Sequence, residues 1–208
     1  MGAGLAFLAA GVLLGLTTLG QGTWLDHAIP SVVERLVPPG SALVRALSSE
    51  RGWPHGAYVT ALLPVAVTMV LLLGEVRRHG ARPVLEQWRW ILLTLAVIPV
   101  HYVLRVAFGR PGPGDPRADA DLVGSYPSGA ALAVGLGWAF YLVVVGELRP
   151  RWRPWVMVLT VFALVVHAAV RVVTAKHWTT DILGSYLLVA GVFLLASTAR
   201  RERSRQHA

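Results

Sequence analysis

Six apolar runs, each close to the length of a membrane-spanning helix, dominate this chain. A helix needs about 20 residues to cross the hydrocarbon core of a bilayer. The runs cover residues 3–19, 57–74, 90–108, 128–146, 155–173 and 181–199. Because a spanning segment must satisfy its backbone polar groups internally, we predict an all-α fold, a bundle of six transmembrane helices. Residues 1–208 show no internal repeat and no separate soluble domain, so we expect one domain.

The composition agrees with a protein that crosses the membrane several times. Hydrophobic residues make up 55% of the 208 residues, and the mean hydropathy is +0.58. The formal net charge of +8 raises the question of a nucleic-acid partner. The arginines lie in short segments between apolar runs, which is typical of membrane topology, so we expect membrane lipids and no nucleic acid. The chain has no cysteine, which excludes disulfides, thiolate catalysis and cysteine-ligated metals.

Arginines also predict the orientation. They concentrate after the second, fourth and sixth runs, at Arg77, Arg78, Arg82, Arg89, Arg149, Arg151, Arg153, Arg200, Arg201, Arg203 and Arg205. The other connecting segments mix arginines with carboxylates. The positive-inside rule therefore places both termini in the cytoplasm. The first run lacks the basic start and the small-residue exit of a signal peptide, so we expect a retained helix.

The long segment between the first two runs carries a helical signal of its own. Val32, Val33, Leu36 and Val37 recur at helical spacing within residues 21–56. We predict a short helix here that lies at the membrane interface.

Three ionisable residues stand between the last two runs, at Arg171, His177 and Asp181, with Lys176, the only lysine, beside the histidine. Ionisable groups at a membrane edge are costly, which makes them candidates for function. The planar fork of an arginine can bind a phosphate. A histidine can serve as nucleophile or proton carrier, and a carboxylate four residues later can hold its ring.

Two further motifs fall at the same predicted membrane depth. The third run ends in Arg105-Val106-Ala107-Phe108-Gly109-Arg110-Pro111-Gly112-Pro113, and the fourth begins at Tyr126-Pro127-Ser128-Gly129-Ala130. Together with Arg171-x5-His177-x3-Asp181, these resemble the three motifs of the type 2 phosphatidic acid phosphatase (PAP2) superfamily, roughly K-x6-R-P, P-S-G-H and S-R-x5-H-x3-D. The resemblance covers the whole chain in motif order, helix number and predicted side.

The resemblance implies a fold of the PAP2 / acid phosphatase–haloperoxidase type in a bacterial inner or plasma membrane. It implies a phosphatase that needs no metal or cofactor, with a lipid phosphate or diphosphate as substrate, such as a polyprenyl diphosphate or a phosphatidate. The site would be extracytoplasmic and would work through a phosphohistidine. In the third motif, His177 would be the nucleophile, Asp181 its orienting partner and Arg171 a phosphate ligand, while Val170 replaces the usual serine.

The other two motifs depart from the family pattern. Ser128 and Gly129 are the expected phosphate donors at a helix start, but the family's proton-donating histidine is replaced by Ala130. In the first motif, either Arg110-Pro111 spells R-P and Val103 occupies the lysine position, or Arg105 occupies that position. We favour the second register, which resembles bacterial K-x4-R-P-R-P patterns. Arg110 would then cover for the arginine lost at Gly112.

The missing acid leaves several interpretations open. His101 and His167 lie four residues before Arg105 and Arg171, so either is a candidate substitute acid, with a hydrogen-bonded core histidine as the alternative. A lipid diphosphate would need the acid least, because its leaving phosphate is already acidic. A pseudoenzyme that binds lipid phosphates or a partner, and a phosphotransferase, are the other readings of the sequence.

Overall fold

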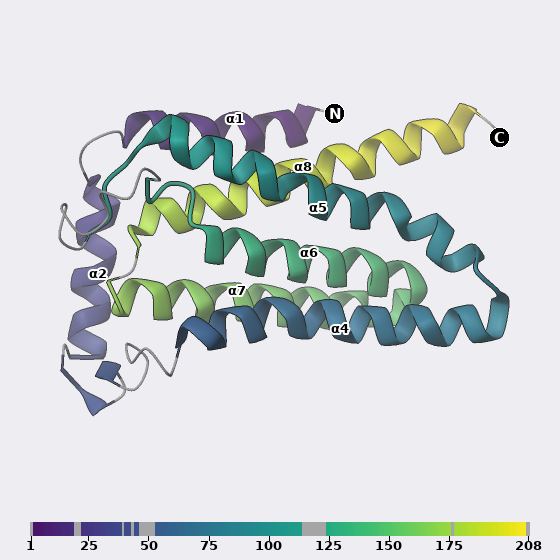
Figure 1. The fold of residues 1–208 in the computed structure, drawn as a ribbon, viewed down its shortest axis with the longest axis horizontal. Coiled ribbons are helices and arrows are strands. Elements are labelled where there is room, and N and C mark those ends of the chain that lie inside the picture. The colour runs from purple at the N-terminus through teal and green to yellow at the C-terminus, as the bar shows by residue number, and fades with distance from the viewer. Residues whose placement is uncertain are drawn as a thin grey trace.

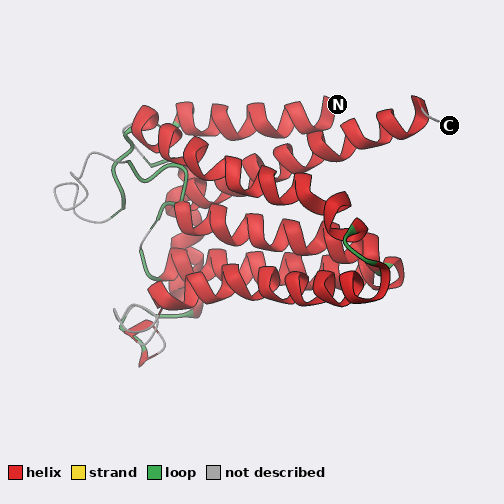
Figure 2. Ribbon diagram, turned by 45° about the vertical axis from the view of Figure 1, so that its right-hand side comes forward, coloured by secondary structure: helices red, strands yellow, loops and turns green. Residues whose placement is uncertain are grey.

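The computed structural model describes residues 2–18, 22–38, 40–42, 44–45, 53–113, 124–175 and 177–206, so Lys176 lies outside the described residues. Within these ranges every regular element is a helix and no strand occurs (Figure 2). The prediction of an all-α fold is confirmed.

In the described part of the chain, six long helices run roughly along one axis, and a shorter helix crosses one end of the bundle (Figure 1). The long helices are α1 (Gly2–Thr17), α4 (Trp53–His79), α5 (Arg82–Phe108), α6 (Gly129–Leu148), α7 (Arg153–Val173) and α8 (Thr179–Gln206). The crossing helix is α2 (Trp24–Leu36), and the 3-10 turn η1 (Pro150–Trp152) joins α6 to α7. The two chain ends lie at the end away from α2 (Figure 1). The predicted short helix in residues 21–56 is thus confirmed as α2.

Among the described residues, five helices are long and apolar enough to cross a membrane. They contain the segments Thr60–His79, Trp90–Phe108, Gly129–Leu148, Pro150–Val173 and Thr179–Thr198. These match five of the six predicted spans, with ends that move by a few residues. The first predicted span, residues 3–19, forms the 16-residue helix α1. At 1.5 Å per residue this helix reaches only about 24 Å, so it is shorter than expected for a full span.

Helix α1 nevertheless packs tightly into the bundle, against α8. Its buried residues are Gly4, Gly11 and Gly15. A Cβ at Gly4 would lie only 2.6 Å from Leu195 Cγ on α8, so a larger residue would force the two helices apart. Small residues at an interface allow the close helix approach on which packing in a membrane depends.

Helix α6 forms the centre of the bundle. Its side chains pack against α4, α5 and α8 in a cluster of buried residues, Leu72, Trp90, Val97, Leu132, Leu136, Phe140, Val144, Val189 and Phe193. The Trp90 and Phe193 rings stack with centroids 5.4 Å apart. This packing holds the first turn of α6 in the middle of the bundle end that α2 covers, beside the ends of α5 and α7.

Candidate active site

The chain turns sharply where α5 ends. Gly109 adopts a left-handed conformation at φ +54°, and its N–H donates to the Arg105 carbonyl over 3.1 Å. The N–H of Gly124 reaches the same carbonyl over 3.2 Å, and the N–H of Ser125 reaches the Arg110 carbonyl over 2.6 Å. Two segments far apart in the loop therefore lie side by side. A Cβ at Gly124 would collide with the Arg110 backbone nitrogen, so this approach requires glycine.

The start of α8 is fixed by one of the predicted site residues. The Asp181 carboxylate accepts a hydrogen bond from the Trp178 N–H over 3.1 Å, and its own N–H donates to the Trp178 carbonyl over 3.1 Å. This is one half of a capping box. His177 precedes α8, which begins at Thr179. The two side chains still meet, with Nδ1 of His177 3.6 Å from Oδ2 of Asp181, within reach of an ion pair but longer than a hydrogen bond.

One cavity of about 820 Å³ collects most of the predicted site residues. His101 and Arg105 line it from α5, Gly129 from α6, Arg171 from the end of α7, and His177 from the α7–α8 connection. The three sequence motifs thus meet in one space at the end of the bundle beneath α2.

Apart from Thr94 and Ser125, the remainder of this cavity is apolar. Its other walls come mainly from α4, α5 and α6, with Ala61, Leu62, Val65, Ile98, Leu132, Ala133 and Leu136. Leu62 and Ile98 also face outward, with 62% and 57% of their surface exposed, so the cavity opens on the side of the bundle between α4 and α5. Among the described residues no carboxylate lines it. The cavity therefore joins a cationic end to a long apolar part.

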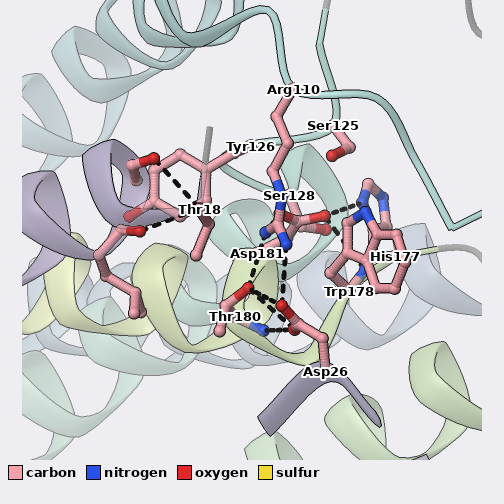
Figure 3. A network of polar contacts seen from close by, with 12 residues as sticks. Thr18, Asp26, Arg110, Ser125, Tyr126, Ser128, His177, Trp178, Thr180 and Asp181 are labelled. Carbon is pink, nitrogen blue, oxygen red and sulfur yellow. Dashed lines mark hydrogen bonds and ion pairs between the residues drawn. The ribbon is translucent and has the colours of Figure 1, made fainter. Parts of the chain in front are cut away.

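Arg110 is not among the residues that line the cavity, and its guanidinium is bound by two carboxylates (Figure 3). Its Nη1 lies 2.6 Å from Asp181 Oδ1 and its Nη2 lies 2.8 Å from Asp26 Oδ2. Nη1 also donates to the Thr180 hydroxyl over 2.7 Å, and the guanidinium lies 5.3 Å from the ring centre of Trp178. Only 1% of Arg110 is exposed. The guanidinium thus contacts Asp181, whereas the sequence suggested that it binds phosphate. The role of Arg110 as a phosphate ligand stays a prediction.

Burial and charge set the protonation of the site. Burial lowers the pKa of His177 below its ordinary value, and the positive charge of Arg171 acts in the same direction, while Asp181 opposes both. Burial alone would raise the pKa of Asp26, but hydrogen bonds from Thr180, Thr23 and Arg110 outweigh it, so this pKa falls below the usual range. His177 is therefore neutral near pH 7, the state in which a histidine acts as a nucleophile.

The sequence profile of the PAP2 superfamily matches residues 86–205, which make up more than half of the chain and include the three segments described above. The chain belongs to the PAP2 superfamily. No curated protein matches it. The structure is similar to the crystal structure described as the first transmembrane PAP2 type phosphatidylglycerolphosphate phosphatase from Bacillus subtilis, with a TM-score of 0.67. The match covers 97% of this chain and 98% of that chain at 17% identity, so it shows a shared fold. The chain is an integral membrane protein with the transmembrane PAP2 fold.

The PAP2 fold helps to choose between the two registers of the first motif. Arg105 lines the cavity, whereas Val103 is 63% exposed on the outer surface of the bundle. The position of these side chains favours Arg105 in the lysine position of the PAP2 motif.

In the second motif, Gly129 and Ala130 line the cavity, whereas Ser128 caps helix α6. Ser128 is fully buried, and its hydroxyl oxygen accepts a hydrogen bond from the Ala131 N–H over 3.3 Å. Gly129 and Ala130 line the cavity in the first turn of α6, where helices offer N–H groups to anions. Ser125 also lines the cavity. The sequence did not lead us to this residue, although a polar side chain directly before Tyr126-Pro127 was a signal for it.

The two candidate acids occupy different places in the PAP2 fold. His101 lines the cavity, and its ring packs against Gly129. His167 is fully buried, with Nδ1 2.9 Å from the Tyr186 hydroxyl, which in turn donates to the Leu164 carbonyl over 3.0 Å. His167 is not among the residues of the cavity. In the described part of the chain, no three His, Asp or Glu residues gather as metal ligands would.

Proposed function

We propose that this PAP2 protein is a membrane lipid phosphatase in which His177 receives the phosphoryl group. The observation that carries the proposal is the cavity of about 820 Å³ with two arginines and two histidines at one end and apolar walls open between α4 and α5. An amphiphile fits such a space, with its phosphate at the arginines and its chain along the apolar walls. The PAP2 family and the fold of a phosphatidylglycerolphosphate phosphatase support the same class of reaction.

The chemistry follows from the orientation of His177. Because Nδ1 faces Asp181, Nε2 is the atom that attacks phosphorus. The bond from phosphorus to the leaving oxygen breaks, and that oxygen takes up a proton. Water then attacks the phosphohistidine, the P–N bond breaks, and inorganic phosphate leaves. Arg105, Arg171 and the first-turn N–H groups of α6 stabilise the negative charge of the phosphoryl group in both steps.

The proton for the leaving oxygen is the weak point, because Ala130 cannot donate one. A general acid contributes about 10²–10⁴-fold in rate, or roughly 3–5 kcal/mol of barrier. Among the two candidates, His101 has the position to replace it, since it lines the cavity. His167 lies outside the cavity and is hydrogen-bonded to Tyr186.

The lack of a proton donor at position 130 favours one class of substrate. An alkoxide that leaves from a phosphate monoester needs a proton, whereas a departing phosphate has a second pKa of only about 6. We therefore propose a lipid diphosphate, such as a polyprenyl diphosphate, as the preferred substrate over phosphatidate. We further propose that the α2 end of the bundle, and with it this site, faces the extracytoplasmic side of a bacterial plasma membrane, which the arginine pattern supports.

Phosphate release by the protein purified in detergent tests this function. We expect release from a polyprenyl diphosphate to exceed release from phosphatidate, and we expect His177→Ala to abolish both. The matched control is His79→Ala, a histidine whose side chain is 65% exposed at the opposite end of the bundle, which should keep full activity. Faster hydrolysis of phosphatidate would contradict the substrate preference, and activity in His177→Ala would contradict the mechanism.

Ala130 also supports a second candidate, a pseudoenzyme that binds lipid phosphates without turnover. Binding of a polyprenyl diphosphate by the wild-type protein, with no phosphate released over hours, would favour it. An added alcohol that acquires the labelled phosphate would instead indicate a phosphotransferase.

A further inference from the structure

Three elements that are far apart in the sequence meet at one buried guanidinium. Asp26 comes from α2, Arg110 from the turn after α5 and Asp181 from the first turn of α8 (Figure 3). The exposed fractions are 2%, 1% and 0%, and the two ion-pair distances are 2.8 and 2.6 Å. In a site of low dielectric, such contacts fix both position and charge.

The oxygens of both carboxylates are divided among several partners. Oδ1 of Asp181 contacts Arg110, which leaves Oδ2 for His177 and the Trp178 N–H. Oδ1 of Asp26 accepts from the Thr180 N–H over 2.8 Å. Oδ2 of Asp26 contacts Arg110 and accepts from the Thr23 N–H over 2.8 Å. Asp26 thus ties α2 to the start of α8, next to His177.

We propose that Asp26 is a positioning residue of the active site, which acts on His177 through Arg110 and Asp181. The proposal rests on the proposed function, because it concerns the nucleophile of that reaction. Together the two carboxylates and the guanidinium hold one net negative charge beside His177. Asp26 offsets the charge of Arg110, so Asp181 keeps its own charge for the imidazole.

The charge balance predicts opposite effects for the two partners of Asp181. With Asp26 neutralised, Arg110 cancels Asp181, and the positive form of His177 loses support. With Arg110 neutralised, two carboxylates remain, and the positive form gains support. A buried charge left without its partner acts strongly because little solvent screens it.

Several charged and titratable groups surround His177. In the two cavities that it lines these are Asp26, His27 and Glu34 on α2, His101 and Arg105 on α5 and Arg171 on α7, while Asp181 on α8 contacts it directly. Apart from Asp26, these stay unchanged when Asp26 or Arg110 is replaced. Differences in pH profile between such variants therefore report the effect of the Asp26–Arg110 pair on His177.

The test compares Asp26→Asn, Arg110→Gln and the double variant, with Glu147→Gln at the far end of the bundle as a control. The first measurement is kcat/KM against pH, whose acid limb reports the free nucleophile. Ionisation of the substrate also affects kcat/KM, but it is the same for all variants and cancels when their acid limbs are compared. The second is carbethoxylation of His177 against pH, followed by peptide mass spectrometry, which needs no turnover. Thermal unfolding in detergent measures the folded fraction.

We expect Asp26→Asn to move the acid limb to lower pH and Arg110→Gln to move it to higher pH, each by about one pH unit. The double variant should return close to the wild-type limb. Asp26→Asn should also lower kcat roughly 10–100-fold with little change in KM, the range found for partners that orient a functional histidine.

Shifts in the same direction, or none, would overturn the proposal. Single variants that unfold while the His177 profile of their folded fraction stays normal would also overturn it, because the pair would then be purely structural. If the wild-type protein hydrolyses no lipid phosphate, the proposed function fails. The carbethoxylation profiles would still show whether Asp26 and Arg110 act on His177.

Discussion

The ring of His101 packs directly against Gly129: a Cβ at position 129 would lie 2.9 Å from His101 Cε1. Gly129 immediately precedes Ala130, the position that we propose corresponds to the proton-donating histidine of the PAP2 pattern. The imidazole of His101 therefore reaches this part of the cavity from α5. The same contact forbids any side chain at position 129 unless His101 moves.

This contact predicts that the effect of His101 depends on the leaving group. His101→Ala should slow hydrolysis of an alkyl phosphate monoester by about 10²–10⁴-fold. It should affect p-nitrophenyl phosphate far less, because nitrophenolate leaves without a proton. Initial rates on both substrates measure the ratio.

Two further variants sharpen this test. Ala130→His placed in the His101→Ala background should restore hydrolysis of the alkyl ester. His167→Ala, which alters a buried histidine outside the cavity, should show no dependence on the leaving group. Equal losses on both substrates in His101→Ala would assign His101 to packing alone.

Arg171 should contribute to transition-state stabilisation. It lines the cationic end of the cavity with Arg105 and His177. Arg171→Ala should lower kcat/KM by about 10²–10³-fold, as the loss of one donor to a developing charge does. Arg151→Ala, an exposed arginine at the other end of the bundle, is the control and should leave kcat/KM unchanged. A similar loss in both variants would show that the effect comes from net charge.

Asp26 should make the fold sensitive to acid. Its pKa is lower in the folded protein than in the unfolded chain, so its stabilising effect is complete above the ordinary value of 3.8 and is lost as pH falls through the folded pKa. Asp26→Asn should lower the stability at pH 7 by about 3–5 kcal/mol, because Arg110 loses a buried partner. Unfolding temperatures measured from about pH 3 to pH 7 should vary less in this variant.

The exposed Glu34→Gln on the same helix is the matched control for this prediction. It should keep the wild-type dependence on pH. A variant Asp26→Asn with wild-type stability at pH 7 would contradict a strong Asp26–Arg110 ion pair.

Local pattern predicted the helices well, since apolar length decides which segments can span a bilayer. For the first predicted run, the described helix α1 has 16 residues and packs on α8 through glycines. The spacing of Arg171, His177 and Asp181 also indicated residues that the fold brings together. It did not indicate that Asp181 also accepts a hydrogen bond from the Trp178 N–H at the start of α8, because an aspartate in the first turn of a helix can serve its cap as well as a histidine.

The Asp26–Arg110 pair could not be predicted from sequence. The two residues are 84 positions apart, and neither belongs to a periodic pattern that includes the other. Ser128 shows a different difficulty. The same hydroxyl can cap a helix or bind a ligand, and only the fold shows that it accepts from the Ala131 N–H.

In the proposed reaction His177 forms a covalent bond to phosphorus, and trapping of that bond tests the reaction at its key step. The protein in detergent would be mixed with a polyprenyl diphosphate labelled in its terminal phosphate, quenched in alkali, where phosphohistidine survives, and digested for mass spectrometry. We predict an acid-labile phosphate on the peptide that contains His177, absent in His177→Ala and retained in His79→Ala. Turnover of the substrate with no phosphate ever detected on that peptide, or with the label on another residue, would contradict the account.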